Sequence, residues 1–316
     1  MIALGIDIGG TSIKGASINE NGEIFDRFSL KVEKADSPEK TIGALADIIN
    51  DFLKTHKYNE PVSGIGVGVP GIADFDKGVV ISSPNLPTWN GFNIKEFLEK
   101  KTNLPVILNN DANVAALGEC VFGAGKKYHN MILLTLGTGV GGGIIIDKKI
   151  YDGNEHRGAE LGHMVIRVNG RQCGCGRRGC FEAYASATGL ILDTKEAMEA
   201  HPKSMLHQVA EELEGVTARN AFVAARRGDK VANEVVDNYI TNLCEGILNY
   251  CNIFRPEAVI LSGGVANEGE YLLNRIREYL KSAEYGMHLS PSVDVDVASL
   301  GYDSGKIGAA CLVLFK

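Results

Sequence analysis

The sequence predicts an α/β fold in which helices cover mixed sheets. Short apolar runs of strand length alternate with longer segments whose apolar residues recur at helical spacing. Glycine accounts for 38 of the 316 residues, and its clusters stand where apolar runs end, at positions where backbone can approach a ligand closely. A strand, a glycine turn and a second strand open the chain and recur after residue 131, which indicates an internal duplication.

Composition and charge exclude several classes of protein. The chain has 316 residues, 45% of them hydrophobic, which is enough for two ordinary domains. Lys and Arg number 32 against 39 Asp and Glu, so no basic field is present to hold nucleic acid or an anionic membrane. The first apolar run stops at Asp7, too early for a signal peptide, and no later run reaches the roughly 18 apolar residues that span a bilayer. We therefore expect a cytoplasmic protein with reduced cysteines.

The first half of the chain predicts an antiparallel meander, a helix and two more strands. Three apolar runs separated by turn residues predict the meander, over residues 2–8, 14–18 and 24–28. Ser37 and Pro38 mark a helix start, because a capping residue is followed by a first-turn proline. Strands at 65–69 and 106–108 end in Gly, Pro, Asn or Asp, which favours a functional edge of the sheet at their carboxyl ends.

The second half repeats the layout and then adds helices. An apolar strand over residues 131–136, a glycine turn over 137–143 and a return strand over 144–146 resemble the opening hairpin. The remaining strands are expected at 258–261 and 293–297. Apolar spacing predicts helices at 218–227, 231–250, 271–280 and 306–314. Residues 190–215 show no clear motif.

The glycine turn at 137–143 also matches the dinucleotide fingerprint G-x-G-x-x-G, and we reject that interpretation. The fingerprint works only where the turn opens a helix, whereas three β-branched residues follow here and favour a strand. A phosphate-binding hairpin fits better. In the same way, the amides and hydroxyl of the turn after Asp7 can line a phosphate, while Asp7 can hold Mg²⁺ directly or through water.

A histidine and several cysteines gather in a glycine-rich segment that is too short for a core. The candidate ligands are His163, Cys173, Cys175 and Cys180. Three thiolates and an imidazole are the tetrahedral set that Zn²⁺ takes in closed structural sites. A disulfide or ordinary packed cysteines are the alternatives, but Cys173 and Cys175 are too close for easy bridging and the glycines leave little apolar surface. With every position filled by protein, zinc would fix the loop and would not catalyse.

Two glycine hairpins and a later Gly-Gly are the layout of the ATPase fold shared by actin, the heat-shock chaperones and hexokinase. Within that layout the sequence resembles the ROK family of sugar kinases and sugar-responsive repressors, nearly end to end. The segments that carry the resemblance are Asp7-Ile8-Gly9-Gly10-Thr11, Leu108-Asn109-Asn110-Asp111-Ala112-Asn113, Gly137-Thr138-Gly139, Glu160-Leu161-Gly162-His163 and the cysteine run from Cys173 to Glu182. The last of these is the most specific.

The resemblance implies an actin-like ATPase (ribonuclease H-like) fold, with a mixed sheet in each of two lobes and a cleft between them. We expect residues 1–118 and 300–316 to form a small lobe, and residues 119–299 a large lobe that carries the zinc loop. Homodimerisation is also implied. No apolar stripe in the sequence identifies the dimer interface.

In the related kinases the aspartate that matches Asp111 is the catalytic base, so the resemblance assigns that role to Asp111. A helix cap is the structural alternative, and the same residue can serve both roles because a helix N-terminus keeps a carboxylate ionised. The resemblance further implies a sugar-binding set that comprises the backbone of Gly71 and the side chains of Asn85, Asn110, Asp111, Glu160, His163 and Glu182. ATP with Mg²⁺ is the implied second substrate, bound by Asp7, Gly9, Gly10, Thr11, Lys14, Gly137, Thr138, Gly139 and Gly264. A solvated lysine at a strand end explains Lys14 equally well.

The predicted function is an ATP-dependent hexose kinase that transfers the γ-phosphoryl group to the 6-hydroxyl of glucose. A kinase for N-acetylglucosamine, N-acetylmannosamine or fructose shares every motif above and stays open. A sugar-responsive repressor is less favoured, because no helix-turn-helix segment is found ahead of the first strand.

Overall fold

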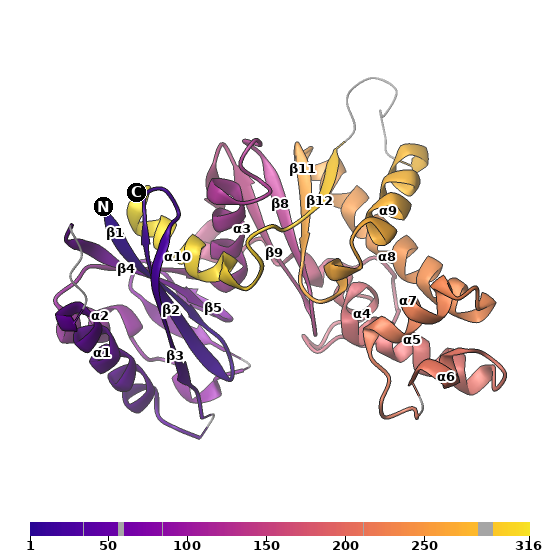
Figure 1. The fold of residues 1–316 in the computed structure, drawn as a ribbon, viewed down its shortest axis with the longest axis horizontal. Helices are drawn as coiled ribbons and strands as arrows, with labels where there is room; N and C mark the ends of the chain where they lie inside the picture. Colours follow the sequence, from indigo (N-terminus) through magenta and orange to yellow (C-terminus); the bar gives the residue numbers. More distant parts are fainter. Residues whose placement is uncertain (34, 56–59, 84, 211, 284–292) are drawn as a thin grey trace. The chain divides into compact units, whose positions relative to one another are not determined.

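The computed structural model describes residues 1–33, 35–55, 60–83, 85–210, 212–283 and 293–316. The chain forms two compact units (Figure 1). The first comprises Met1–His129, Gly143–Ala159 and Ser299–Lys316, and the second comprises Asn130–Gly142 and Glu160–Ala298. The sequence predicted a small lobe at residues 1–118 with 300–316 and a large lobe at residues 119–299. That division into domains stays a prediction.

The first unit contains a five-stranded mixed sheet of order β3-β2-β1-β4-β7. Strand β1 pairs antiparallel with β2 and parallel with β4, which in turn is parallel to β7. The strands are β1 (Ile2–Ile8), β2 (Ser12–Asn19), β3 (Ile24–Lys31), β4 (Val62–Val69) and β7 (Val106–Asn110). The predicted meander is confirmed. A short antiparallel hairpin, β5 (Ile72–Asp74) with β6 (Val79–Ser82), follows the carboxyl end of β4.

One side of this sheet is covered by α1 (Pro38–Thr55) and α2 (Ile94–Thr102), whose buried apolar residues join those of β1 and β4 in one core. Helices α3 (Asp111–Phe122) and α10 (Ser304–Leu314) pack against each other, and α10 also packs against β1 and β4. Successive residues of β1 face opposite sides of the sheet. Leu4, Ile6 and Ile8 therefore pack in the core with α1 and α2, while Gly5 faces α10.

Glycines let α10 approach the sheet and α3 backbone to backbone. A methyl group added at Gly5 of β1 would lie 1.9 Å from the carbonyl oxygen of Lys306, and one at Gly66 of β4 would lie 1.7 Å from that of Ala309. A methyl group at Gly308 would lie 1.6 Å from the carbonyl oxygen of Val114 in α3. Only glycine fits at these positions, because real Cβ contacts are far longer.

The second sheet has the order β10-β9-β8-β11-β12, which repeats the pattern of the first. Strand β9 pairs antiparallel with β10, while β11 is parallel to both β8 and β12. The strands are β8 (Met131–Leu136), β9 (Val140–Ile146), β10 (Lys149–Tyr151), β11 (Ala258–Ser262) and β12 (Asp294–Val297). The matching orders support the internal duplication.

The helices of the second unit come after the cysteine run Cys173–Cys180, some of them before β11 in the chain and one after it. They are α4 (Glu182–Ala185), α5 (Ala187–Ala200), α6 (Leu206–Ala210), α7 (Ala218–Arg226), α8 (Lys230–Phe254) and α9 (Glu270–Ala283). Residues 190–215, where no motif was found, therefore hold most of α5 and all of α6. Within the described ranges no helix combines the length and apolar content that crossing a membrane requires.

Candidate functional site

Asp7 stands near the end of β1, opposite Lys14 in the β1–β2 pairing. Burial raises the pKa of Asp7, and the charges of Lys306 and Lys14 act against that effect. A methyl group added at Gly305, in the first turn of α10, would lie 2.9 Å from the Asp7 carboxylate. The ammonium group of Lys14 is exposed and lies 5.7 Å from the ring centre of Tyr302. The Asp7 carboxylate is thus buried close to the charges of two lysines.

The turn between β1 and β2 is tight and lies beside Asn85. The amide of Gly9 donates to the carbonyl of Ser12 at 2.9 Å, which closes the turn. A methyl group at Gly10 would lie 3.1 Å from the Asn85 Cβ atom. Thr11 is exposed, and its carbonyl accepts from Val32. A predicted phosphate turn and a predicted sugar residue are thus neighbours within the first unit.

The junction of β7 and α3 carries the candidate base. The side-chain oxygen of Asn110 accepts from the amides of Ala112 at 2.9 Å and Asn113 at 3.3 Å, so Asn110 is the N-cap of α3. Asp111 is the first residue of the helix, and its carboxylate accepts from the Ala112 amide at 2.9 Å. The cap that was considered for Asp111 therefore belongs to its neighbour. This arrangement places a carboxylate at the positive end of α3.

Asn110 also joins Gly71 to the junction. Its side-chain amide donates to the Gly71 carbonyl at 3.3 Å. Gly71 has a φ of 89°, and an added methyl group would lie 2.4 Å from the carbonyl of Ser82, so glycine is required. The first unit thus holds Gly71, Asn85, Asn110 and Asp111 of the predicted sugar set, and the second unit holds Glu160, His163 and Glu182.

The four candidate metal ligands converge as predicted. One ligand atom each from His163, Cys173, Cys175 and Cys180 lies within 4.8 Å of the others. The sulfurs of Cys175 and Cys180 are 3.7 Å apart, and the sulfur of Cys173 is 3.7 Å from His163 Nδ1. A tetrahedral zinc ion with Zn–S distances of about 2.3 Å has ligand-to-ligand edges of about 3.8 Å. The donor set and its spacing therefore fit structural zinc.

The surroundings of the three thiols shift their pKa values in different directions. Burial raises the pKa of Cys173 to about 12, and burial also raises the pKa of Cys180. The Arg177 backbone amide lowers the pKa of Cys175. Binding of a divalent cation would release the protons of these thiols, as metal sites built from cysteine require.

Glu182 connects the metal loop with the glycine turn. One carboxylate oxygen accepts from the Val140 amide at 2.9 Å, and the other accepts from the Cys173 thiol at 3.5 Å. A methyl group at Gly139 would lie 2.3 Å from the same carboxylate. The sequence offered Glu182 as a sugar ligand, but its contact with the glycine turn was missed, because nothing local to residue 182 signals it.

The glycine turn is shorter than predicted. Strand β9 begins at Val140, so the turn is confined to residues 137–139. The Gly137 amide donates to the Gly139 carbonyl at 3.0 Å, and the Thr138 carbonyl accepts from the Thr188 hydroxyl at 2.7 Å. The turn leads into a strand and not into a helix, which confirms the rejection of the dinucleotide fingerprint.

Glu160 immediately precedes a single 3₁₀ turn, Leu161–His163, and His163 is its last residue. The His163 amide donates to the Glu160 carbonyl at 3.1 Å. The buried Tyr250 of α8 donates its hydroxyl to the Leu161 carbonyl at 2.6 Å, which anchors the turn to the core. Both predicted sugar ligands therefore have fixed backbones.

A cavity of about 340 Å³ lies beside the Gly-Gly turn that follows β11. It is lined by Ala218, Arg219, Phe222, Arg226, Gly264, Val265, Asn267 and Glu268. A methyl group on Gly264 would meet no atom within 4 Å, so the space in front of this residue is open. The sequence predicted the glycine and a helix at residues 218–227, but not that this helix, α7, lines the cavity beside Gly264.

A model of the ROK family matches residues 3–316 of the chain. A glucokinase of Halalkalibacterium halodurans is 38% identical over 98% of this chain and 94% of its own length. A xylose repressor of Bacillus spizizenii is 34% identical over 99% of this chain and 77% of its own length. The structure of a ROK glucokinase from Streptomyces griseus, solved with glucose and AMPPNP, superposes with a TM-score of 0.82 at 34% identity and covers both chains fully. The predicted actin-like ATPase fold is confirmed by this likeness, and the chain belongs to the ROK family.

Proposed function

We propose that the chain is an ATP-dependent hexose kinase that phosphorylates the 6-hydroxyl of glucose, with Asp111 as the base. The observation that carries this proposal is the full-length likeness to a glucokinase that was solved with glucose and an ATP analogue. The geometry at the start of α3 supports it. Asn110 provides the helix cap, and Asp111 is the first residue of α3, where the helix N-terminus favours an ionised carboxylate.

In the proposed reaction the Asp111 carboxylate accepts the proton of the 6-hydroxyl. The sugar oxygen then forms a bond to the γ-phosphorus, while the bond from the γ-phosphorus to the β,γ-bridging oxygen breaks and ADP leaves. Such transfer passes through a loose transition state, so positioning and charge stabilisation matter more than the strength of the base. When bound with ATP, Mg²⁺ would neutralise phosphate charge, and Asp7 is the residue proposed to hold it, directly or through water.

The residues proposed to hold sugar hydroxyls are Gly71, Asn85, Asn110, Glu160, His163 and Glu182. A site that hydrogen-bonds each hydroxyl rejects analogues that lack one. Phosphates would meet the turns Gly9-Gly10-Thr11 and Gly137-Thr138-Gly139, with Lys14 close by. The cavity beside Gly264 is the proposed place of the adenosine group, and its volume suits a small ligand.

A panel of sugars tests this proposal. The chain is incubated with ATP, Mg²⁺ and each of glucose, fructose, N-acetylglucosamine and N-acetylmannosamine, and kcat/KM is measured from ADP release. We expect glucose to give the highest value. A higher value for another sugar would assign the same chemistry to that substrate.

A sugar-responsive regulator is the second candidate, because the xylose repressor matches nearly the whole chain. Sugar binding by calorimetry without ADP release for any sugar would favour it. By family likeness we also propose a homodimer in the cytoplasm, and sedimentation analysis would show its mass.

Structural zinc is the proposed role of the His163 and cysteine cluster, and metal analysis tests it. Elemental analysis of the purified wild-type chain should give about one zinc per chain. Replacing the buried Cys180 by serine should abolish that content, lower Tm and weaken glucose binding at least about tenfold, because the loop would no longer be fixed. Cys244→Ala is the matched control, since this buried cysteine lies in α8 outside the cluster. Full zinc content in Cys180→Ser would contradict the assignment.

A further inference from the structure

Asn109, the residue before the proposed sugar-binding Asn110, has a side-chain amide whose orientation is fixed by its neighbours. Its side-chain oxygen accepts from the backbone amide of Asn110 at 2.8 Å and from the side-chain amide of Asn113 at 3.0 Å. If the amide were turned around, its NH₂ group would face these two donors. The NH₂ group must therefore point the other way, and it donates to an Asp152 carboxylate oxygen at 3.4 Å. The Asn109 side chain is buried, so water cannot easily replace a lost partner.

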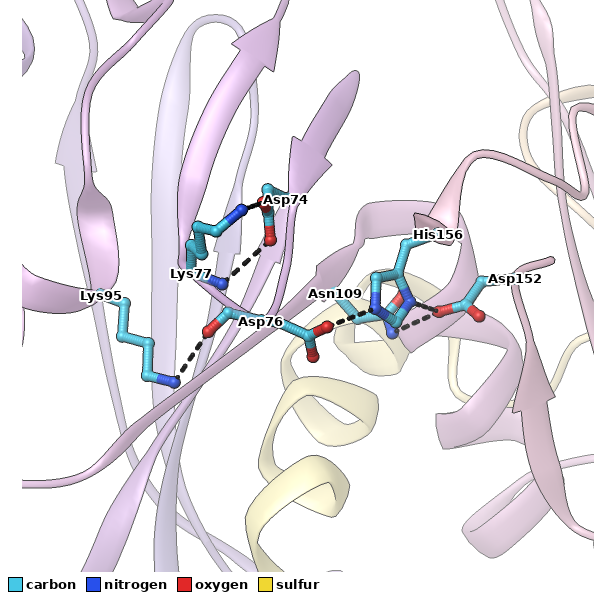
Figure 2. Close-up of polar contacts among 7 residues, drawn as sticks. All are labelled: Asp74, Asp76, Lys77, Lys95, Asn109, Asp152 and His156. Atoms are coloured by element: carbon cyan, nitrogen blue, oxygen red, sulfur yellow. Dashed lines mark hydrogen bonds and ion pairs between the residues drawn. The ribbon is translucent and has the colours of Figure 1, made fainter. Parts of the chain in front are cut away.

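Asp152 is held in turn by His156, as Figure 2 shows. The same Asp152 oxygen lies 2.7 Å from His156 Nδ1, and His156 Nε2 lies 3.4 Å from the carboxylate of Asp76. The imidazole also meets the Phe75 ring edge to face, with 5.7 Å between ring centres. His156 therefore joins the turn between β5 and β6 to the Asp152 carboxylate.

Several residues of the loop that carries His156 have an energetically unfavourable backbone conformation. Glu155 and His156 have φ values of 53° and 57°, and Ala159 has 61°. Residues other than glycine seldom adopt this left-handed conformation, and they do so where the surroundings impose it, most often at functional sites. The ring contact and the polar contacts of His156 offset the cost of this conformation.

The charges around His156 favour its protonated form. Partial burial lowers the pKa of His156, but the hydrogen bonds and charges of Asp152 and Asp76 outweigh it and raise the pKa overall. The other charged groups that face the imidazole or its two partners are Asp74 and Lys77 of the β5–β6 hairpin, Lys95 of α2, and Glu155 and Arg157 of its own loop. The imidazolium can donate to both aspartates, whereas a neutral ring has only one N–H group to share between them.

We propose that Asp152 and His156 are positioning residues for the Asn110–Asp111 junction, acting through the side-chain amide of Asn109. The proposal rests on the proposed function, because Asp111 matters only if it is the base. Neither residue needs to touch the sugar. Asp152 accepts from the side-chain NH₂ group of Asn109 and so fixes its orientation. The Asn109 oxygen accepts from the backbone amide of Asn110. Asn110 in turn is the N-cap of α3, whose first residue is Asp111.

Asp152→Ala tests whether the Asp152 carboxylate fixes the side-chain amide of Asn109. We expect kcat to fall about 10- to 100-fold, with a much smaller rise in the KM for the sugar, because a displaced catalytic group costs rate more than binding. Asp152→Asn keeps an acceptor oxygen and should recover most of the rate. The matched control is Asp74→Ala, since Asp74 belongs to the same cluster in Figure 2 but pairs with Lys77 at 2.8 Å, with no contact to Asn109 among the contacts of the described residues.

His156→Gln tests the pH dependence. Glutamine can donate to Asp152 but does not titrate. In the wild type, kcat should decline as the pH rises through the raised pKa of His156, and this decline should be absent in the variant. A decline that persists unchanged in His156→Gln would overturn the role of the imidazole.

The outcomes separate this proposal from the proposed function. If the wild type phosphorylates none of the four sugars, the kinase assignment fails whatever the variants do. If the wild type is active and Asp152→Ala keeps its kcat, the positioning role is overturned. If Asp152→Ala does not fold, the pH profile of His156→Gln decides: loss of the decline in kcat supports the positioning role, and an unchanged decline overturns it. Equal losses in Asp152→Ala and Asp74→Ala would likewise overturn the proposal, because they would show a general effect of charge.

Discussion

Asp111→Ala is expected to lower kcat by about a thousandfold or more, while glucose still binds and the chain still folds. The reason for the loss is that a positioned base contributes about 10²–10⁴-fold to proton transfer. The reason for the preserved fold is local. Asn110 supplies the cap of α3 and the contact with Gly71, so removing the neighbouring carboxylate leaves both in place. The checks are steady-state kinetics, calorimetry with glucose and a thermal melt.

Asn110→Ala is the informative companion to this variant. It should cost about 1 kcal/mol of stability through the lost cap and should also weaken sugar binding. A variant Asp111→Ala with turnover near that of the wild type would end the proposed base role. Loss of glucose binding in Asp111→Ala, with an unchanged melt, would instead assign Asp111 mainly to sugar recognition.

Gly308→Ala is expected to destabilise the chain by at least about 3 kcal/mol, at the upper end of the cost of overpacking. The added methyl group would lie 1.6 Å from the Val114 carbonyl oxygen and 2.8 Å from the Gly118 amide nitrogen. Both obstacles are backbone, so no side chain can rotate away, and α10 would have to separate from α3. Urea unfolding at constant pH measures the change in the free energy of unfolding.

Gly43→Ala provides a control of opposite sign. Gly43 lies inside α1, where an added methyl group would approach only the tip of Phe97, at 4.0 Å. Alanine is a better helix former than glycine, so this variant should gain about 0.5–1 kcal/mol. A loss in Gly308→Ala no larger than 1 kcal/mol would contradict the close packing of α10.

The sequence allowed prediction of the parts of the fold that depend on neighbours along the chain. The opening meander, the N-terminus of α1 and the strand after the glycine turn all follow from local patterns of glycine, proline and β-branched residues. The clustering of His163 with three cysteines was also predictable, because short spacing forces such residues together. The limits of the turn at 137–139 were predicted less well, since glycines within a strand look like turn residues.

Contacts between distant segments could not be foreseen. Gly5 is an unremarkable strand residue until Lys306 is seen against it, and nothing near Asn109 announces Asp152. Asp and Asn are both common caps, and the sequence analysis considered Asp111, not Asn110, as the cap of α3. In the structure Asn110 accepts from the amides of Ala112 and Asn113 and is therefore the N-cap of α3.

The position of α10 in the chain also has a consequence for biosynthesis. This helix packs on β1, β4 and α3, yet it is translated only after every residue of the second unit. Until then the growing polypeptide would expose the glycine-lined side of an N-terminal sheet that has already left the ribosome. Nascent chains of this protein should therefore need protection by a holding chaperone for longer than chains whose domains are contiguous in sequence.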